Sequence, residues 1–240
     1  MVCQKTIETL KKWIAESENI VFFGGAGVST ESGVPDFRSV DGIYNMKYAY
    51  PPETIISHSF FIKKTKEFYD FYKDKMIYSD AKPNITHKKL AELEKTGKLK
   101  AVITQNIDGL HQAAGSSVVL ELHGSVLRNY CMKCHKFYGV DEILNQKDIP
   151  HCSCGGIIKP DVVLYEEGLD EAVLYNAINK ISEADVLIVG GTSLSVYPAA
   201  GLINFYRGNK LVLINKSITP YDKEADLLIQ TGLGEVFSVL

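Results

Sequence analysis

A short apolar strand that runs into a glycine-rich turn constrains this chain more than any other feature. Residues 19–23 read Asn-Ile-Val-Phe-Phe, a β-branched and aromatic run typical of a strand buried on both faces of a parallel sheet. The turn that follows, Gly25-Ala26-Gly27, lets the backbone bend sharply and leaves amide groups free for phosphate oxygens. A strand followed by such a turn is the usual opening of a dinucleotide site.

The spacing of this turn differs from that of an ordinary dehydrogenase. A Rossmann fingerprint has a third glycine where this chain has Thr30, and an acidic residue about 20 residues later at the end of the second strand. Here the next stretch carries Pro35, Pro51 and Pro52 in place of a helix and a strand. The turn is therefore a nucleotide loop of another kind or a purely structural glycine turn, and a plain oxidoreductase is disfavoured.

Composition and charge are those of an ordinary globular protein. Of the 240 residues, 45% are hydrophobic and 23% are charged, and the net charge of −3 gives no global attraction to nucleic acid or anionic membranes. The first 18 residues carry lysines and glutamates and no apolar leader, and no later stretch is apolar for long enough to cross a bilayer. We expect a cytoplasmic monomer that binds neither nucleic acid nor membranes directly.

Apolar runs alternate with amphipathic stretches along most of the chain. The predicted strands are residues 19–23, 100–106, 118–122, 185–189, 211–214 and 226–230. The predicted helices are residues 6–17, 59–75, 86–96, 170–182 and 198–207. This alternation predicts an α/β fold, a Rossmann-like parallel sheet with helices on both faces and with ligands at the carboxyl ends of its strands. Aromatic residues on one face of the 59–75 helix, among them Phe61, Phe68 and Tyr72, predict packing against a core.

Four of the five cysteines lie within residues 131–154, and only Cys3, to which the sequence assigns no role, stands apart. They form two closely spaced pairs, the knuckles of a zinc site. Two residues separate Cys131 from Cys134, and one residue separates Cys152 from Cys154. In an intracellular chain this pattern indicates a metal site more than disulfides. Four thiolates would close a tetrahedral shell around one structural Zn²⁺, which would stabilise an inserted module without taking part in chemistry. His135 and His151 are alternative ligands.

Polar residues follow several predicted strands at the edge where a parallel sheet binds ligands. Gln105, Asn106 and Asp108 follow the 100–106 strand and can hydrogen-bond an amide and ribose hydroxyls, although their pattern is equally a turn. His123 ends the next strand and is either a structural histidine or a base that takes a proton near neutral pH.

Two further strands end in the same way. Gly191-Thr192-Ser193 follows the 185–189 strand, and Asn215 follows the 211–214 strand. Both place small hydroxyl, amide and backbone groups where phosphates and an adenosine ribose can lie.

In this order, these stretches resemble the sirtuin family of NAD-dependent protein deacylases, and in particular its compact bacterial and archaeal members. The matching segments span nearly the whole chain: residues 25–29, 36–38, 104–111, 123–124, 159–164, 191–194, Asn215 and the four cysteines. The resemblance implies a Rossmann-like NAD-binding domain formed by residues 1–38, 84–124 and 160–240. It also implies a helical insertion at 39–83 and a small zinc-binding module at 125–159.

The resemblance further implies NAD as co-substrate, one structural Zn²⁺ and an acylated lysine peptide as substrate. The residues implied to bind NAD are Gly25, Ala26, Gly27, Thr30, Asp36, Phe37, Arg38, Gln105, Asn106, Ile107, Asp108, His123, Gly191, Thr192, Ser193, Asn215 and Leu233. The peptide would pair as a strand with Val163, Leu164 and Tyr165 on one side and with the segment around Val196 on the other.

The implied reaction transfers the acyl group from lysine to ADP-ribose and releases nicotinamide. His123 is implied as the general base on a ribose hydroxyl, with Asn106 as the second catalytic residue. Phe37 would shield the sugar from water, and Asp108 would hold the nicotinamide carboxamide. The alternatives are a mono-ADP-ribosyltransferase and a non-catalytic NAD-binding sensor module in which His123 is structural.

Two departures from the family pattern bear on specificity. The family often has Phe-Gly-Glu where this chain has Tyr165-Glu166-Glu167, so we expect added bulk and charge in the peptide groove. Members that prefer succinyl or malonyl lysine carry Tyr-x-x-Arg. The aligned stretch here runs from Tyr69 to Tyr72, with Tyr72 in place of the arginine. The missing guanidinium favours acetyl and other uncharged acyl groups, since Lys73 is expected on another face of the helix.

Overall fold

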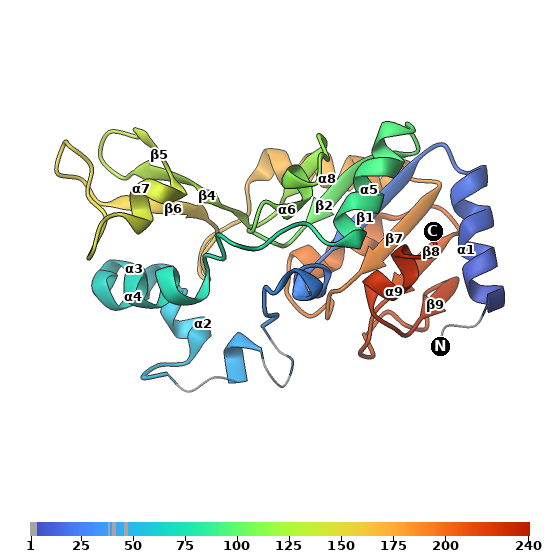
Figure 1. The fold of residues 1–240 in the computed structure, drawn as a ribbon, viewed down its shortest axis with the longest axis horizontal. Helices are drawn as coiled ribbons and strands as arrows, with labels where there is room; N and C mark the ends of the chain where they lie inside the picture. Colours follow the sequence, from blue (N-terminus) through green and yellow to red (C-terminus); the bar gives the residue numbers. More distant parts are fainter. Residues whose placement is uncertain (1–3, 38, 40–41, 46–47) are drawn as a thin grey trace.

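The computed structural model describes residues 4–37, 39, 42–45 and 48–240, and two sheets organise them. A six-stranded sheet has the order β3-β2-β1-β7-β8-β9, and a three-stranded sheet has the order β5-β4-β6. The two sheets lie at opposite ends of the molecule (Figure 1). Among the described residues, no helix combines the length and the apolar character that crossing a bilayer requires.

The six-stranded sheet confirms the predicted parallel architecture, because every neighbouring pair of its strands is parallel. Its strands are β1 (Ile20–Gly24), β2 (Leu99–Thr104), β3 (Val119–Glu121), β7 (Val186–Gly190), β8 (Leu211–Ile214) and β9 (Leu227–Ile229). Each lies within two residues of its predicted place. The order is that of a doubly wound nucleotide-binding fold, with the switch point between β1 and β7.

Helices cover both faces of this sheet, as predicted. They are α1 (Gln4–Glu16), α5 (Ile85–Lys95), α6 (Leu110–Ala113), α8 (Glu171–Glu183) and α9 (Leu233–Phe237). Successive side chains of β1 alternate between the two faces: Phe22 packs in the cluster that includes α1, α5 and α9, and Phe23 packs in the cluster that includes α8. Both rings are fully buried, and each contributes about 2–3 kcal/mol through burial.

Two helix predictions are wrong in detail. The 59–75 helix is broken at Lys64, whose backbone is not helical, into α3 (His58–Lys63) and α4 (Thr65–Lys75). Thr65 Oγ1 donates to the Phe61 carbonyl at 2.7 Å across this break. The segment predicted as a helix at 198–207 is a 3₁₀ helix, η4 (Ala199–Phe205). Hydrophobic spacing alone does not distinguish these cases, because the apolar side chains still face the core.

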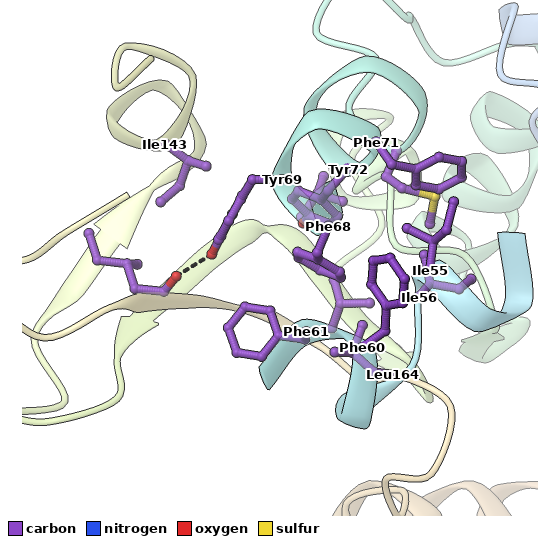
Figure 2. Packing of buried hydrophobic residues seen from close by; sticks show 14 of the residues in the cluster. Ile55, Ile56, Phe60, Phe61, Phe68, Tyr69, Phe71, Tyr72, Ile143 and Leu164 are labelled. Atoms are coloured by element: carbon purple, nitrogen blue, oxygen red, sulfur yellow. Dashed lines mark hydrogen bonds between the residues drawn. The ribbon is translucent and has the colours of Figure 1, made fainter. Parts of the chain in front are cut away.

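The small sheet comprises β4 (Gly124–Cys131), β5 (Phe137–Gly139) and β6 (Ile158–Val162), with α7 (Val140–Leu144) beside it. The helices of the predicted insertion, α2 (Pro52–Ile55), α3 and α4, pack against it in one hydrophobic cluster. Figure 2 shows the aromatic rings of α3 and α4 packed beside Ile143 and Leu164, and the Tyr69 hydroxyl donating to the Ile158 carbonyl. The predicted aromatic face is thus buried, and two insertions far apart in the sequence share one core.

A pair of buried histidines lies between α5 and α6. The rings of His87 and His111 are 4.7 Å apart, and neither ring nitrogen of His111 has a hydrogen-bond partner among the described residues. Burial lowers the pKa of His87 to about 4, and burial together with the neighbouring His87 lowers the pKa of His111 to about 3. Both rings are therefore neutral in the folded protein at pH values where an unfolded chain already protonates them.

We predict that this pair makes the fold sensitive to mild acid. Above the ordinary histidine pKa of about 6.5 the pair has no effect, and as pH falls towards the folded-state values the unfolded chain binds more protons. Between pH 7 and pH 5 the free energy of unfolding should fall by about 2 kcal/mol for each histidine. Urea denaturation at both pH values measures this, and His111→Leu should remove about half of the loss. An unchanged pH dependence in that variant would contradict the assignment.

Candidate functional site

Two glycine loops meet at the switch point of the large sheet. The Gly27 amide donates to the Gly191 carbonyl at 2.8 Å, and the Gly25 amide donates to the Gly190 carbonyl at 3.2 Å. A Cβ on Gly27 would lie 2.8 Å from the Gly191 Cα, and Gly191 itself has a φ of 62°. The glycines are therefore needed for close contact between two backbones. The expectation that the Gly25 and Gly27 amides are free for phosphate is wrong for these two groups.

A cavity of about 710 Å³ opens beside these loops and falls within the usual size range of small-molecule sites. Every described residue that the sequence analysis assigned to NAD or to the peptide lines it, whereas Arg38 lies outside the described residues. The loops that follow β1, β2, β3, β7 and β8 all contribute. The cavity thus brings together segments that are far apart in the sequence, and the individual roles of these residues stay predictions.

A buried serine connects two of the polar loops. Ser29 Oγ donates to Asp108 Oδ2 at 2.6 Å and accepts from Asn106 Nδ2 at 3.0 Å. The other carboxylate oxygen of Asp108 accepts from the Leu110 amide at 2.9 Å. Burial raises the pKa of Asp108, an effect that the hydrogen bond from Ser29 opposes. Ser29 therefore fixes the side chains of Asn106 and Asp108 relative to the first glycine loop.

His123 lies where the chain passes from β3 to β4. Its Nδ1–H donates to the Gln105 carbonyl at 3.0 Å, because a carbonyl can only accept. In the neutral ring this leaves Nε2 unprotonated and able to take a proton. Burial lowers the pKa of His123, although the Gln105 hydrogen bond opposes this. Only glycine fits at the next position, since a Cβ on Gly124 would lie 1.9 Å from the Asp161 carbonyl oxygen.

The segment predicted to bind a peptide is held from both sides. The Val163 amide donates to the His123 carbonyl at 3.0 Å. The Tyr165 amide donates to the Ile56 carbonyl at 3.0 Å, and the Tyr165 carbonyl accepts from the His58 amide at 2.9 Å. Val196 lines the same cavity from the segment after β7. Residues 163–165 and the segment around Val196 therefore line the same cavity.

The two glutamates expected to add charge to this groove, Glu166 and Glu167, both line the cavity. The Glu166 carboxylate accepts two hydrogen bonds from Ser59 in α3, and the Glu167 carboxylate accepts from Lys159 at 3.1 Å. Both carboxylates thus lie at the cavity while bound to neighbouring segments, and their effect on peptide preference stays a prediction. Lys73 lies on another face of α4, as expected, where its ammonium group donates to the carbonyls of Gln146 and Asp148.

The four clustered cysteines form a metal site. Their Sγ atoms all lie within 4.8 Å of one another, and the closest pairs are 3.4–3.5 Å apart. Four thiolates around a tetrahedral Zn²⁺ with bonds of about 2.3 Å would be about 3.8 Å apart, so the donor set fits zinc. Backbone amides of Lys133 and Cys154 point at two of the sulfurs, at 3.4 and 3.5 Å. The predicted four-cysteine set is confirmed as a group, and four ligands leave no open position for chemistry.

Comparison with known proteins decides the family. The family model described as "Sir2 family" matches residues 25–198, well over half of the chain. The chain belongs to the Sir2, or sirtuin, family. A Clostridium acetobutylicum protein named NAD-dependent protein deacetylase is 59% identical over 244 aligned positions, and the match covers 100% of both chains. A Clostridium perfringens protein of the same name is 62% identical over 234 positions, with 96% of each chain covered.

Solved Sir2 structures share the fold. A Sir2 variant with a deacetylated peptide and 3'-O-acetyl ADP-ribose has a TM-score of 0.89 at 41% identity, covering 97% of this chain and 96% of that chain. A Sir2 complex with a peptide and NAD⁺ has a TM-score of 0.86 at 40% identity, with the same coverage. The resemblance to sirtuins and the predicted fold class are therefore confirmed.

Sequence reasoning missed two residues that shape the sirtuin site. Ser29 is part of the first glycine motif, but nothing in the sequence showed that it would contact a loop 79 residues away. Glu31 accepts from the Gly234 amide at the start of α9 at 3.2 Å, and so connects the first loop to a short helix that was not predicted. The role of each residue depends on a contact with a distant part of the chain, and local sequence patterns do not reveal such contacts.

We predict that the zinc site stabilises the small domain. Cys131→Ser should lose the single zinc per chain and lower the melting temperature by about 10 °C, since metal binding is coupled to folding of such modules. Elemental analysis and calorimetry measure both effects. Cys3→Ser is the matched control and should keep one zinc. A full complement of zinc in Cys131→Ser would contradict the assignment.

Proposed function

We propose that this protein is an NAD-dependent protein lysine deacetylase that transfers the acetyl group from lysine to ADP-ribose. Membership in the sirtuin family and relatives of that name at 46–62% identity support this. The observation that carries the proposal is one cavity that brings His123 and the Asn106–Asp108 loop together with the two glycine loops and residues 163–165.

NAD, when bound, supplies the ADP-ribose that accepts the acetyl group and the nicotinamide that leaves. The loops that would hold it are those of Ala26, Thr30, Ser193 and Asn215, all of which line the cavity. Gln105 is fixed towards the second glycine loop by a hydrogen bond from Nε2 to Thr192 Oγ1 at 3.0 Å. The polar groups around the implied nicotinamide position are thus prearranged in the protein, which lowers the cost of orienting a bound molecule.

His123 is suited to act as the general base. Its Nδ1–H is held by the Gln105 carbonyl, so Nε2 would accept the proton from a ribose hydroxyl. The lowered pKa keeps this nitrogen free of a proton at neutral pH and somewhat below it. Asn106, held by Ser29, is proposed to orient the groups that react, and Phe37 to exclude water from the sugar.

The acyl group is proposed to be uncharged. Tyr72 lines the cavity where succinyl- and malonyl-preferring family members carry an arginine, and burial raises its pKa well above the ordinary value, so that it stays neutral. Its hydroxyl has no partner among the described residues. Lys75 also lines the cavity but is paired with Asp74 at 3.0 Å. An acyl carboxylate would lose its water here with a neutral tyrosine in place of the arginine that would pair with it.

The finer expectations are proposals as well. We propose that the peptide pairs as a strand with residues 163–165 and with the segment around Val196. We also propose a cytoplasmic monomer that acts on proteins. Four free cysteines grouped for a metal support a reducing compartment.

We predict that His123 is required for turnover. Mass spectrometry of an acetyl-lysine peptide with NAD should show equal amounts of deacetylated peptide, nicotinamide and O-acetyl-ADP-ribose. His123→Ala should lower kcat by about 10²–10⁴-fold and still bind NAD. The acid limb of kcat/KM for the unchanged protein should lie below pH 6.5, because its base has a lowered pKa.

Each alternative predicts another outcome for this assay. Label from NAD retained on a protein target, with the acetyl group still on lysine, would indicate a mono-ADP-ribosyltransferase. Bound NAD with no product, or equal turnover in His123→Ala, would indicate a sensor module or another base.

We predict strong discrimination against charged acyl groups. A succinyl-lysine peptide should have a kcat/KM at least about 100-fold below that of the butyryl-lysine peptide, which has the same chain length and no carboxylate. Steady-state kinetics with the two peptides measure the ratio, and acetyl-lysine serves as the reference. Equal turnover of succinyl and butyryl peptides would show that a cation reaches the acyl group.

A further inference from the structure

A tight turn follows the segment that borders the peptide groove. The Glu167 amide donates to the Leu164 carbonyl at 3.0 Å, which closes a four-residue turn with Tyr165 and Glu166 at its centre. Glu166 has a φ of 75°, the left-handed conformation that this place in a type II turn requires and that glycine adopts most easily. The glycine of the Phe-Gly-Glu pattern fits this requirement. This chain has a glutamate there, so its side chain must supply a compensating contact.

That contact is made to a distant part of the chain. Glu166 Oε2 accepts from the Ser59 amide at 2.8 Å, and Oε1 accepts from Ser59 Oγ at 3.0 Å, across 107 residues of sequence. The Ser59 amide belongs to the first turn of α3, where amides have no acceptor within the helix. The carboxylate is thus bound through both oxygens to the helical insertion.

The same turn has other contacts that do not involve the Glu166 side chain. Glu167 accepts from Lys159 Nζ at 3.1 Å and from the Leu164 amide at 2.9 Å, and lies 2.8 Å from His58 Nδ1. Tyr165 pairs with residues 56–58 through its backbone. Removing the Glu166 carboxylate therefore leaves the turn and the pairing of Tyr165 with residues 56–58 in place, and removes only the two hydrogen bonds to Ser59.

We propose that Glu166 is a positioning residue for peptide recognition, which fixes residues 163–165 against α3 before the peptide arrives. The proposal rests on the proposed deacetylase function, in which the peptide adds a strand to this segment. A peptide that binds to a prearranged edge avoids the cost of ordering that edge, so the contact strengthens peptide binding. Glu166 lines the cavity but is not among the residues assigned to NAD or to the reacting atoms, so we expect its removal to leave NAD binding and chemistry intact.

The test compares three substitutions at this position. Glu166→Ala and Glu166→Gly lose both hydrogen bonds, and we expect each to raise the peptide KM about 5–10-fold with kcat and the NAD KM within twofold of the unchanged protein. Glu166→Gln keeps an acceptor for the Ser59 amide and a group that can bond its hydroxyl, and should stay within twofold. Glu171→Ala, at an exposed glutamate that begins α8, is the matched control.

The outcomes separate this proposal from the proposed function. If the unchanged protein does not deacetylate the peptide, the proposed function fails, and fluorescence anisotropy of the acetyl-lysine peptide with the variants still tests the contact. An unaltered peptide KM in Glu166→Gly overturns the proposal. A loss in Glu166→Gln as large as in Glu166→Ala also overturns it, because charge and not attachment would then matter. Ser59→Ala removes one of the two hydrogen bonds from the other side and should raise the peptide KM about 2–3-fold.

Discussion

The close contact between the two glycine loops is the constraint on which the rest of the site depends. Gly27 and Gly191 touch backbone to backbone, and side chains at either position would separate the loops. Because the loops follow neighbouring parallel strands, this contact sets where β1 and β7 deliver the residues after them. Ser29, in the first loop, fixes the side chains of Asn106 and Asp108 by hydrogen bonds. The Gln105 carbonyl in turn fixes the ring of His123. The position of the proposed base, His123, thus depends on the packing of the two glycine loops.

The sequence predicted most of the large sheet and of the residues that line the cavity, for a physical reason that also explains its failures. Buried parallel strands are short apolar runs, and ligand residues follow their carboxyl ends, so both are visible locally. The break at Lys64 and the 3₁₀ conformation of η4 left no trace, because they preserve the apolar face. The role of Ser29, the contact between Glu31 and α9, and the shared core of the two insertions depend on tertiary contacts that no local pattern contains.

The junction between the six-stranded and the three-stranded sheet combines a steric and an electrostatic restraint. Arg128 in β4 donates to Glu121 in β3 at 2.6 Å and to Asp161 in β6 at 2.8 Å, and so joins the large sheet to the small one. Gly124, which only a glycine can occupy, lies beside the Asp161 backbone at the same junction. His123 is between these restraints, at the junction of the two sheets. A residue placed there can contact groups from both parts of the structure.

The core shared by the two insertions has a consequence for synthesis of the chain. Tyr69 on α4 is made 89 residues before Ile158, whose carbonyl accepts the hydrogen bond from its hydroxyl, and its aromatic neighbours pack in the same cluster. At translation rates of roughly 5–20 residues per second, that surface waits on the order of 5–20 s for its partner. During this interval the rings of α4 lack the residues of the small sheet that pack against them in the folded protein, and hydrophobic surface left uncovered in this way favours aggregation.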